Sequence, residues 1–316
     1  MATNKTKKQA SKIDLFNHMD ILILRKRSIG KDSTADLYRA SSNWLRKFVK
    51  KRNLCLSEIT PALVDDFIVY LQRLGSLKVN SVNSYVCAFR AMYNVITREH
   101  GYIPCRHPFA HIVIHPEKTT KRAVGLDVFE RISALDLKDE PEMQKAADLC
   151  VFSFIACGMP FVDLAHLTRE NINGDTLVYN RAKTGAPIRI DLTPGMNYLL
   201  DKYSSADNPY LFSLLPPEGP FPHEHYKSLL RNYNDCLKEI GKRLDLPTSL
   251  TSYVIRHSWA TIAYRKYTPV AIISQALGHT SEKTTRHYLA QLDQSELSKA
   301  NILITGTVDN IVKRRA

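Results

Sequence analysis

The stretch LGHTSEKTTRHYLA, residues 277–290, decides how the second half of the chain is expected to fold. Gly278 predicts the end of one helix, and Thr280 or Ser281 can cap the helix that follows. That helix carries many hydroxyl and cationic side chains and few apolar ones, so packing alone does not explain its composition. A phenol near a histidine on a basic surface can act as a covalent nucleophile. Tyr288 is therefore either a packed aromatic or a chemical group.

The rest of the second half reads as mostly helical. One strand–turn–strand segment interrupts the helical pattern at residues 171–192, where Asn173-Gly174 and Thr184-Gly185 are turn signals. We therefore expect a mixed α/β domain, mostly helical with a small antiparallel sheet. Its helices are predicted at 126–135, 142–157, 222–244, 250–264, 269–277 and 281–290.

The first half is predicted to form a small all-helical bundle over roughly residues 13–105. Apolar side chains recur at helical spacing in three stretches, and basic side chains lie outside the apolar stripes. The stretches are 33–50 with Ser33 or Thr34 as its cap, a second helix opened by Thr60-Pro61, and a third from Asn80 or Ser81 to Gly101.

Two segments outside the helices lack a helical pattern. Residues 1–12 are polar and lysine-rich, and are expected to be disordered. Residues 106–122 hold two prolines and a basic end, which predicts a linker to a domain over 123–295.

The charge of the chain is strongly basic and unevenly distributed. The net charge is +13 and the pI is about 9.4, which indicates an acidic partner. Residues 1–110 carry 19 Lys and Arg against 8 Asp and Glu, whereas the other 206 residues carry 25 against 23. The first half is therefore expected to clamp a nucleic acid, with a merely solvated basic surface as the alternative.

The composition argues against a secreted, membrane or metal-binding protein. The six cysteines show no CxxC pairing and are expected to be reduced, as in a cytoplasmic protein. The N-terminus has no apolar core of a secretory signal, and no apolar run approaches the ~18 residues of a membrane span. His107, His111 and His115 are spaced by four, but Pro108 and Pro116 break the helix that a metal face would need, so no metal is expected.

Two further motifs precede Tyr288 in a fixed order. NRAKTG places Lys183 at a predicted hairpin tip, and TSYVIRHSWAT places Arg256 and His257 early in a helix. Together with LGH and the tyrosine, these motifs resemble those of the tyrosine recombinases, the phage integrase family of DNA breaking and joining enzymes. The resemblance covers roughly residues 122–295, and the bundle is more weakly similar to the core-type DNA-binding domain of that family.

The resemblance implies phosphoryl transfer on double-stranded DNA without a metal or another cofactor. Tyr288 would attack a phosphodiester and form a 3′-phosphotyrosyl link. Arg256 and His279 would stabilise charge on the phosphate oxygens, with His257 in a supporting place. Lys183 would protonate the leaving 5′ oxygen as general acid.

The sequence departs from the family pattern where an arginine is usual. In GMPFVDLAHL, residues 158–167, Asp163 matches the pattern but Pro160 stands at the arginine position. An arginine at a phosphoryl transition state can contribute ~10³–10⁵ in rate, so another cation has to substitute or the chain is inactive. Arg181 is the first candidate, because a strand would place it on the same face as Lys183. Arg122 in the linker is the second.

A second departure lies in the box that usually reads H-x-x-R. Here it reads Tyr253-Val254-Ile255-Arg256. A tyrosine hydroxyl can still donate a hydrogen bond to phosphate, although it carries no positive charge near neutral pH. Tyr253 is therefore a candidate catalytic residue, with a packed aromatic beside Arg256 as the alternative.

The resemblance also implies a homotetramer acting on two DNA sites. Residues 296–316 would then dock on the neighbouring protomer, the alternative being packing onto their own domain. Because the bundle begins within roughly the first 35 residues, inversion or resolution is expected before accessory-heavy phage integration, with integration of a mobile element also open. The competing hypothesis is a catalytically impaired DNA-binding member of the same fold, which Pro160 favours.

Overall fold

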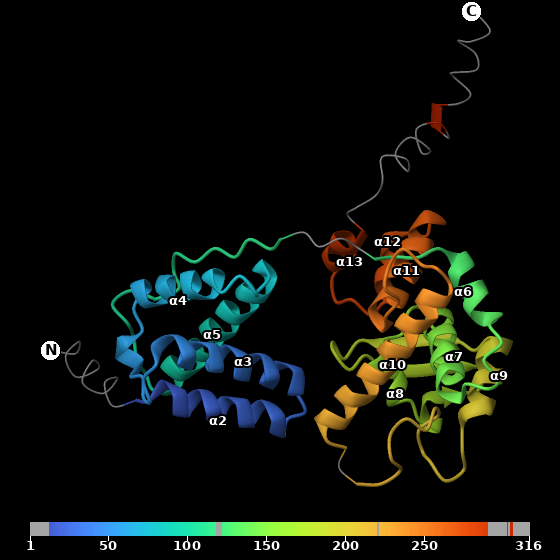
Figure 1. Ribbon diagram of the computed structural model, residues 1–316, viewed down its shortest axis with the longest axis horizontal. Coiled ribbons are helices and arrows are strands. Elements are labelled where there is room, and N and C mark those ends of the chain that lie inside the picture. Colours follow the sequence, from blue (N-terminus) through green and yellow to red (C-terminus); the bar gives the residue numbers. More distant parts are fainter. Residues whose placement is uncertain (1–12, 118–121, 220, 290–301, 303, 306–316) are drawn as a thin grey trace, which may run out of the picture. The chain divides into compact units, whose positions relative to one another are not determined.

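The chain divides into two compact units, Met1–Thr119 and Thr120–Ala316. The computed structural model describes residues 13–117, 122–219, 221–289, 302 and 304–305. Each unit has its own hydrophobic core. Figure 1 shows that helices dominate both units. The predicted disordered segment 1–12 lies outside the described residues, as does nearly all of the predicted tail 296–316.

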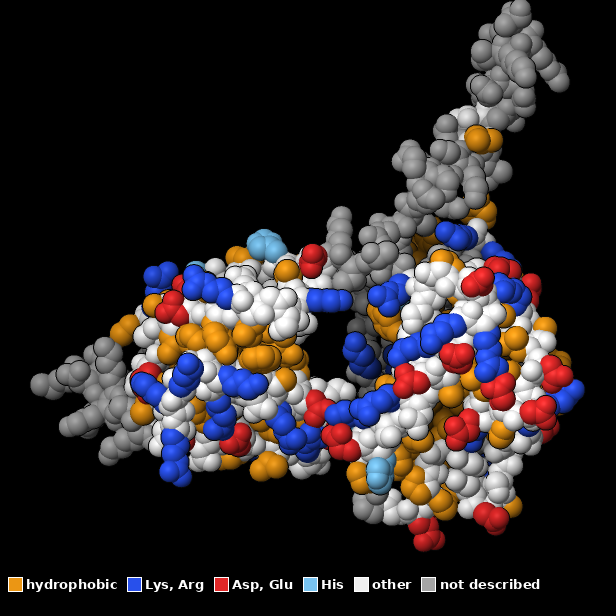
Figure 2. All heavy atoms as spheres, viewed as in Figure 1, with side chains coloured by type: hydrophobic (Ala, Val, Ile, Leu, Met, Phe, Trp, Pro, Cys, Tyr) orange, Lys and Arg blue, Asp and Glu red, His pale blue; other side chains and the backbone are white. Residues whose placement is uncertain are grey.

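The described part of the first unit is helical. The three predicted helices are confirmed as α3, α4 and α5. On the face shown in Figure 2, Lys and Arg side chains are spread over this unit among apolar ones. The elements are α2 (Leu15–Ser28), α3 (Asp32–Val49), η1 (Leu56–Glu58), α4 (Pro61–Arg73) and α5 (Val79–Glu99).

Helix α2 was not predicted, although its signals are in the sequence. The Asp14 carboxylate accepts the N–H of Phe16 at 3.1 Å and caps the helix. Met19 and Leu22 are buried on the same face as Phe16, at the spacing of an amphipathic helix. The cluster Arg25–Arg27 follows at the C-terminal turn, where cations are favoured.

One predicted cap is wrong and one is confirmed. Ser33 and Thr34 lie inside α3, whose N-cap is Lys31 and has no side-chain hydrogen bond. At α4 the predicted cap is present, because the Thr60 hydroxyl accepts the N–H of Leu63 at 3.2 Å.

The stretch predicted as a linker, 106–122, packs partly onto the first unit. Phe109 is buried, and its ring lies edge-on to Phe89 with 5.0 Å between centroids. The Asn80 side chain of α5 donates to the carbonyl of Glu117 and accepts the N–H of the same residue. The apolar run around Phe109 explains the difference, since its burial favours packing over an extended connection.

The second unit is mostly helical with one three-stranded sheet among its described residues. The predicted helices and the predicted strand–turn–strand segment are confirmed, and the fold class expected from the sequence is therefore correct. The elements are α6 (Leu126–Ser133), α7 (Pro141–Ile155), α8 (Phe161–Ala165), η2 (Arg169–Asn171), β1 (Ile172–Asn173), β2 (Thr176–Asn180), β3 (Pro187–Asp191), α9 (Pro194–Tyr203), α10 (His223–Arg243), α11 (Ser252–Arg265), α12 (Val270–Ala276) and α13 (Glu282–Leu289).

The sheet is antiparallel throughout, in the order β1-β2-β3. Tyr179 pairs with Ile188, and both side chains are buried against the helical core. Asn180 pairs with Pro187 at the end of the ladder. The turn that follows β2 therefore leaves the sheet at this end, and it carries the motif NRAKTG.

Two helices of this unit were not predicted. Helix α9 has a Thr193 cap whose hydroxyl accepts the N–H of Met196, followed by Pro194 at the first helical position. That pair is a readable start signal. Helix α8 is only five residues long, and its start at Pro160 has no side-chain cap hydrogen bond, so the sequence offers little to predict it.

Helices α12 and α13 rest on a separate small apolar cluster. It consists of Ala260, Ile273, Leu277 and Leu289, which draw α11, α12 and α13 together.

In the described part of the chain, no helix combines the length and the apolar character needed to cross a membrane.

Replacing Phe67 tests the core of the first unit. Phe67 is fully buried on α4 and its ring contacts those of Phe48 and Phe89. Phe67→Ala should lower the free energy of unfolding by about 3–5 kcal/mol, because it removes apolar burial and leaves a cavity. Val69→Ala on the same helix, where Val69 is 40% exposed, should cost less than about 1 kcal/mol. Urea denaturation of both variants measures the difference, and equal costs would contradict it.

Candidate active site

Five of the site residues predicted from the sequence line one cavity of the second unit, which has a volume of about 600 Å³. Arg181, Lys183, Tyr253, Arg256 and His279 all line it, together with Pro160. They come from the turn after β2, from α11 and from the loop between α12 and α13. Among the described residues that line the cavity there are three Lys and Arg and no carboxylate. The cavity is therefore suited to an anion.

Arg256 is buried on α11 and is held by backbone carbonyls. Its side chain is 7% exposed. One guanidinium nitrogen donates to the carbonyl of Gly158 at 3.1 Å, and the other donates to the carbonyl of Leu277. Gly158 has φ of +69°, and a Cβ there would lie 2.8 Å from the Arg256 Cα. Only glycine permits this approach, so Gly158 helps to fix the arginine.

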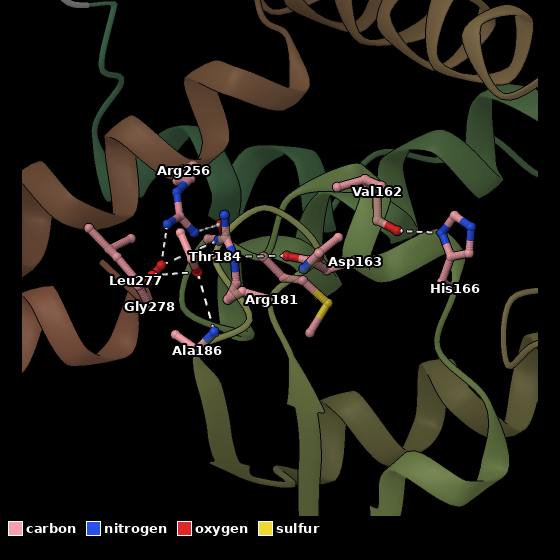
Figure 3. A network of polar contacts seen from close by, with 12 residues as sticks. Val162, Asp163, His166, Arg181, Thr184, Ala186, Arg256, Leu277 and Gly278 are labelled. Carbon is pink, nitrogen blue, oxygen red and sulfur yellow. Dashed lines mark hydrogen bonds and ion pairs between the residues drawn. The ribbon is translucent and has the colours of Figure 1, made fainter. Parts of the chain in front are cut away.

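Arg181 lies beside Arg256 and donates to the same carbonyl. Its Nη1 is 3.3 Å from the Leu277 oxygen, and the residue is 7% exposed. Its Nε lies 3.0 Å from an Asp163 carboxylate oxygen, a charge contact whose orientation is not that of a hydrogen bond. Figure 3 shows the two guanidinium groups converging on Leu277. The reason given for Arg181 from the sequence was wrong, because β2 ends at Asn180 and Arg181 belongs to the turn.

Asp163 ties the turn to helix α8. One carboxylate oxygen accepts the N–H of Ala182 at 2.8 Å, while the other faces Arg181. Burial raises the pKa of the Asp163 carboxyl, and the Ala182 N–H, Arg181 and Arg256 act in the opposite direction. The carboxylate thus holds both the backbone of the turn and one of its cations.

Lys183 projects from a turn that is anchored on both sides. Ala182 is bonded to Asp163, and the Thr184 hydroxyl donates to the carbonyl of Gly278 at 3.1 Å. Lys183 itself is exposed and lines the cavity. Figure 3 shows Thr184 between Ala186 and Gly278. The turn that carries Lys183 is therefore bonded to two segments that are distant in the sequence.

Gly278 makes the approach of this turn possible. It has φ of +62°, and a Cβ there would lie 2.6 Å from the Arg181 Cγ and 3.0 Å from the Ile188 Cδ1. The glycine of LGH therefore both ends the preceding helix and leaves room for a buried arginine.

His279 is held by the helix that follows it. Its Nδ1 lies 2.8 Å from the hydroxyl oxygen of Thr285 in α13. Burial lowers the pKa of the His279 imidazole to about 4, and the charges of Arg256, Arg181 and Lys183 add to this. The imidazole is therefore neutral near pH 7, and one of its nitrogens carries the donor hydrogen.

The two candidates for the missing arginine differ in position. Pro160 is the N-cap of α8 and lines the cavity without offering a charge. Arg181 lines the same cavity, whereas Arg122 is exposed and is not part of the lining. The geometry therefore favours Arg181.

Tyr253 and His257 form an aromatic pair at the edge of the cavity. Their rings are 4.2 Å apart at an interplanar angle of 85°. Tyr253 is 60% exposed and His257 is buried. Tyr253 is thus not a core aromatic, and it contributes to the lining of the cavity.

Tyr288 lies in α13, one helix after the LGH motif. The position of its side chain lies outside what the structure describes, so its role as nucleophile stays a prediction. Sequence reasoning missed Gly158, Thr184 and Thr285. Gly158 lies two residues before Pro160, in the motif that was read for its missing arginine. The partner of Thr184 is 94 residues away, whereas Thr285 lies only six residues from His279, and no spacing rule marks that pair.

Comparison with known proteins gives one consistent family. A model described as "Phage integrase family" matches residues 127–295, and one described as "Phage integrase SAM-like domain" matches residues 14–111. A tyrosine recombinase of Thermosipho africanus is 24% identical over 281 residues, covering 84% of this chain and 94% of that protein.

Solved structures share the fold at low sequence identity. The Tn1549 transposon integrase in complex with transposon right end DNA has a TM-score of 0.63 at 13% identity, covering 93% of this chain and 100% of that chain. A lambda integrase tetramer bound to a Holliday junction has a TM-score of 0.60 at 17% identity, covering 89% and 79%.

Gly278→Ala should disturb Arg181 in addition to straining the backbone. Both Gly278 and Gly174 have positive φ, but only at Gly278 would a Cβ meet other atoms within 4 Å. Gly174→Ala should therefore cost about 1 kcal/mol for the left-handed backbone alone, and Gly278→Ala about 1–3 kcal/mol more for overpacking. Thermal unfolding of both variants measures the difference. Equal losses would contradict the close approach.

His279 should titrate far below an ordinary histidine. An NMR titration of the imidazole should give a midpoint near pH 4. Since the unfolded chain takes up this proton at higher pH than the folded one, His279 should make stability fall as the pH drops from about 6.5 towards 4. His279→Gln should remove that part of the pH dependence. A midpoint at or above 6.5 would rule out the neutral imidazole.

Proposed function

Because the chain belongs to the phage integrase family, we propose that it is a site-specific DNA recombinase that acts through a 3′-phosphotyrosyl intermediate. The observation that carries this proposal is the cavity where Arg181, Lys183, Arg256 and His279 meet. Phosphoryl transfer depends mainly on positioning and on stabilising charge at phosphate oxygens. A cavity lined by cations and a neutral imidazole donor is suited to this task.

Each candidate site residue has a part in the proposed reaction. The Tyr288 oxygen bonds to phosphorus while the bond to the 5′ oxygen breaks, and the phenol proton leaves to solvent. Arg256, His279 and Tyr253 donate to the non-bridging oxygens. Lys183 gives its proton to the leaving 5′ oxygen. The link to phosphorus is kept, so a 5′ hydroxyl of another strand can reverse the step.

Arg181 takes the part of the arginine that is absent at Pro160. Its guanidinium donates to the same carbonyl as that of Arg256, and Asp163 fixes its Nε side. Two planar guanidinium groups side by side can contact different oxygens of one phosphate. Pro160 and Arg181 line the same cavity, which supports the proposal that Arg181 replaces the missing arginine.

The basic first unit provides the main affinity for double-stranded DNA. Residues 1–110 hold most of the net charge, and neutralising phosphates releases counterions. A tetramer on two DNA sites is part of the proposal, and the likeness to a lambda integrase tetramer on a Holliday junction supports it. The biological outcome is inversion, resolution or integration of a mobile element, and a cytoplasmic location follows from the DNA substrate.

A DNA-binding protein without catalysis is the second candidate. Pro160 is the observation that favours it, because the usual arginine is absent. A protein that only binds DNA needs neither the anchored Lys183 turn nor the buried Arg181, which favours the enzyme.

Covalent attachment to DNA should depend on Tyr288. The probe is duplex DNA that is selected from a randomised pool by affinity for the whole chain. It is nicked at successive positions, so that the short fragment with the leaving 5′ hydroxyl dissociates after cleavage and cannot be rejoined. The wild-type chain should form an adduct that survives denaturing electrophoresis. Tyr288→Phe should form none and keep its DNA affinity, since it loses one oxygen. An adduct with the Phe variant would remove Tyr288 from the nucleophile role.

Arg181→Ala should lower the cleavage rate on the order of 10³-fold, with a smaller effect on DNA affinity. Arg189→Ala is the matched control, because Arg189 is exposed on β3 of the same hairpin. Pro160→Arg should help little, since a further guanidinium would crowd and repel the resident ones. Full activity of Arg181→Ala would pass the role to Arg122. An inactive wild type that gains activity with Pro160→Arg would favour the binding protein.

A further inference from the structure

The hydroxyl of Thr285 is completely buried and points at the histidine of the LGH motif. Thr285 is 0% exposed on α13, and its oxygen lies 2.8 Å from the Nδ1 of His279. Leu289, one turn further along the same helix, belongs to the small cluster with Ile273 and Leu277. The contact is therefore made by a helix that is packed onto the unit through its own apolar residues.

The burial of the hydroxyl decides the direction of this hydrogen bond. A buried hydroxyl proton needs an acceptor, because leaving it unsatisfied costs about 1–3 kcal/mol. Among the described residues, the polar partner of the Thr285 hydroxyl is the His279 ring nitrogen. The ring is close to Arg181, Lys183 and Arg256, which disfavour a charged imidazolium. A neutral ring can accept at Nδ1 only when its hydrogen is on the other nitrogen.

We propose that Thr285 is a positioning residue that donates its hydroxyl proton to Nδ1 of His279 and thereby holds the imidazole in the tautomer protonated at Nε2. The donor hydrogen is then on the ring nitrogen that is not bonded to Thr285. In the opposite tautomer the Nε2 lone pair would repel a phosphate oxygen. The threonine acts only through the histidine, without touching a substrate.

This assignment connects the histidine that donates to phosphate with the helix of the nucleophile. Its meaning for catalysis rests on the proposed function. Thr285 and Tyr288 lie on the same helix, one turn apart. In the proposed reaction, the helix that carries the nucleophile also carries the hydroxyl that sets the histidine. The donor to phosphate is thus complete only when the helix of the nucleophile is in place.

The tautomer can be measured without knowing the DNA site. Long-range ¹⁵N–¹H NMR spectra of the full chain labelled with ¹⁵N-histidine distinguish a protonated ring nitrogen from an unprotonated one, and His279→Gln assigns the signals. The wild-type chain should show a protonated Nε2 and an unprotonated Nδ1 at pH 7. Thr285→Ser should keep this pattern, because it keeps the hydroxyl.

Thr285→Val removes the hydroxyl at nearly constant volume and should move His279 to a mixture of tautomers or to the Nδ1-protonated form. Thr284→Val, at the preceding exposed position of α13, is the control and should leave the tautomer unchanged. Thr285→Ala is a second variant without the hydroxyl, should the valine disturb folding in a thermal unfolding test. A wild-type ring protonated at Nδ1, or a tautomer unchanged in the Val and Ala variants, would overturn the proposal.

A kinetic measurement separates this inference from the proposed function. On the nicked duplexes described above, Thr285→Val should slow adduct formation by about 10–10²-fold and Thr285→Ser by little, because a misplaced donor loses part of an oxyanion contact. Slow cleavage by the Val variant with an unaltered tautomer would also overturn the positioning role. If the wild-type chain forms no adduct, the proposed function fails, while the spectra still decide the tautomer.

Discussion

The carbonyl of Leu277 is the group around which the candidate site is arranged. It lies at the C-terminal end of α12, where helix carbonyls lack partners within the helix. The guanidinium groups of Arg181 and Arg256 both donate to it. One backbone acceptor thus fixes two buried cations from segments far apart in the sequence. The positions of the Lys183 turn and of the LGH loop depend on this arrangement.

Burying two guanidinium groups is unfavourable without compensation, and the fold meets this cost with local geometry. Carbonyls of Gly158 and Leu277 replace water around Arg256, and Asp163 lies beside Arg181. Two glycines with positive φ, Gly158 and Gly278, let the backbone come close enough for these contacts. The result is a set of donors oriented before any ligand binds, which is the condition for electrostatic stabilisation in catalysis.

The sequence predicted which residues line this cavity better than it predicted the contacts that hold them. Lys183, Arg256 and His279 were predicted from ordered motifs, and the cavity brings them together. Arg181 was chosen for a strand position that it does not have. The contacts that place it, to Asp163 and to Leu277, join residues with no local signature. The same reason explains why Thr184 was missed, since its partner Gly278 is 94 residues away. Helices α2 and α9 were not predicted although their caps can be read from the sequence.

The two anchors of the Lys183 turn also limit its length. A single residue separates Ala182, which is bonded to Asp163, from Thr184, which is bonded to Gly278. A residue inserted between them would have to break one bond or push the lysine away from the cavity. Homologous chains built on this pattern should therefore vary in the outer strands of the hairpin and keep this spacing constant. The fixed spacing of the two anchors therefore limits how far the Lys183 ammonium group can reach into the cavity.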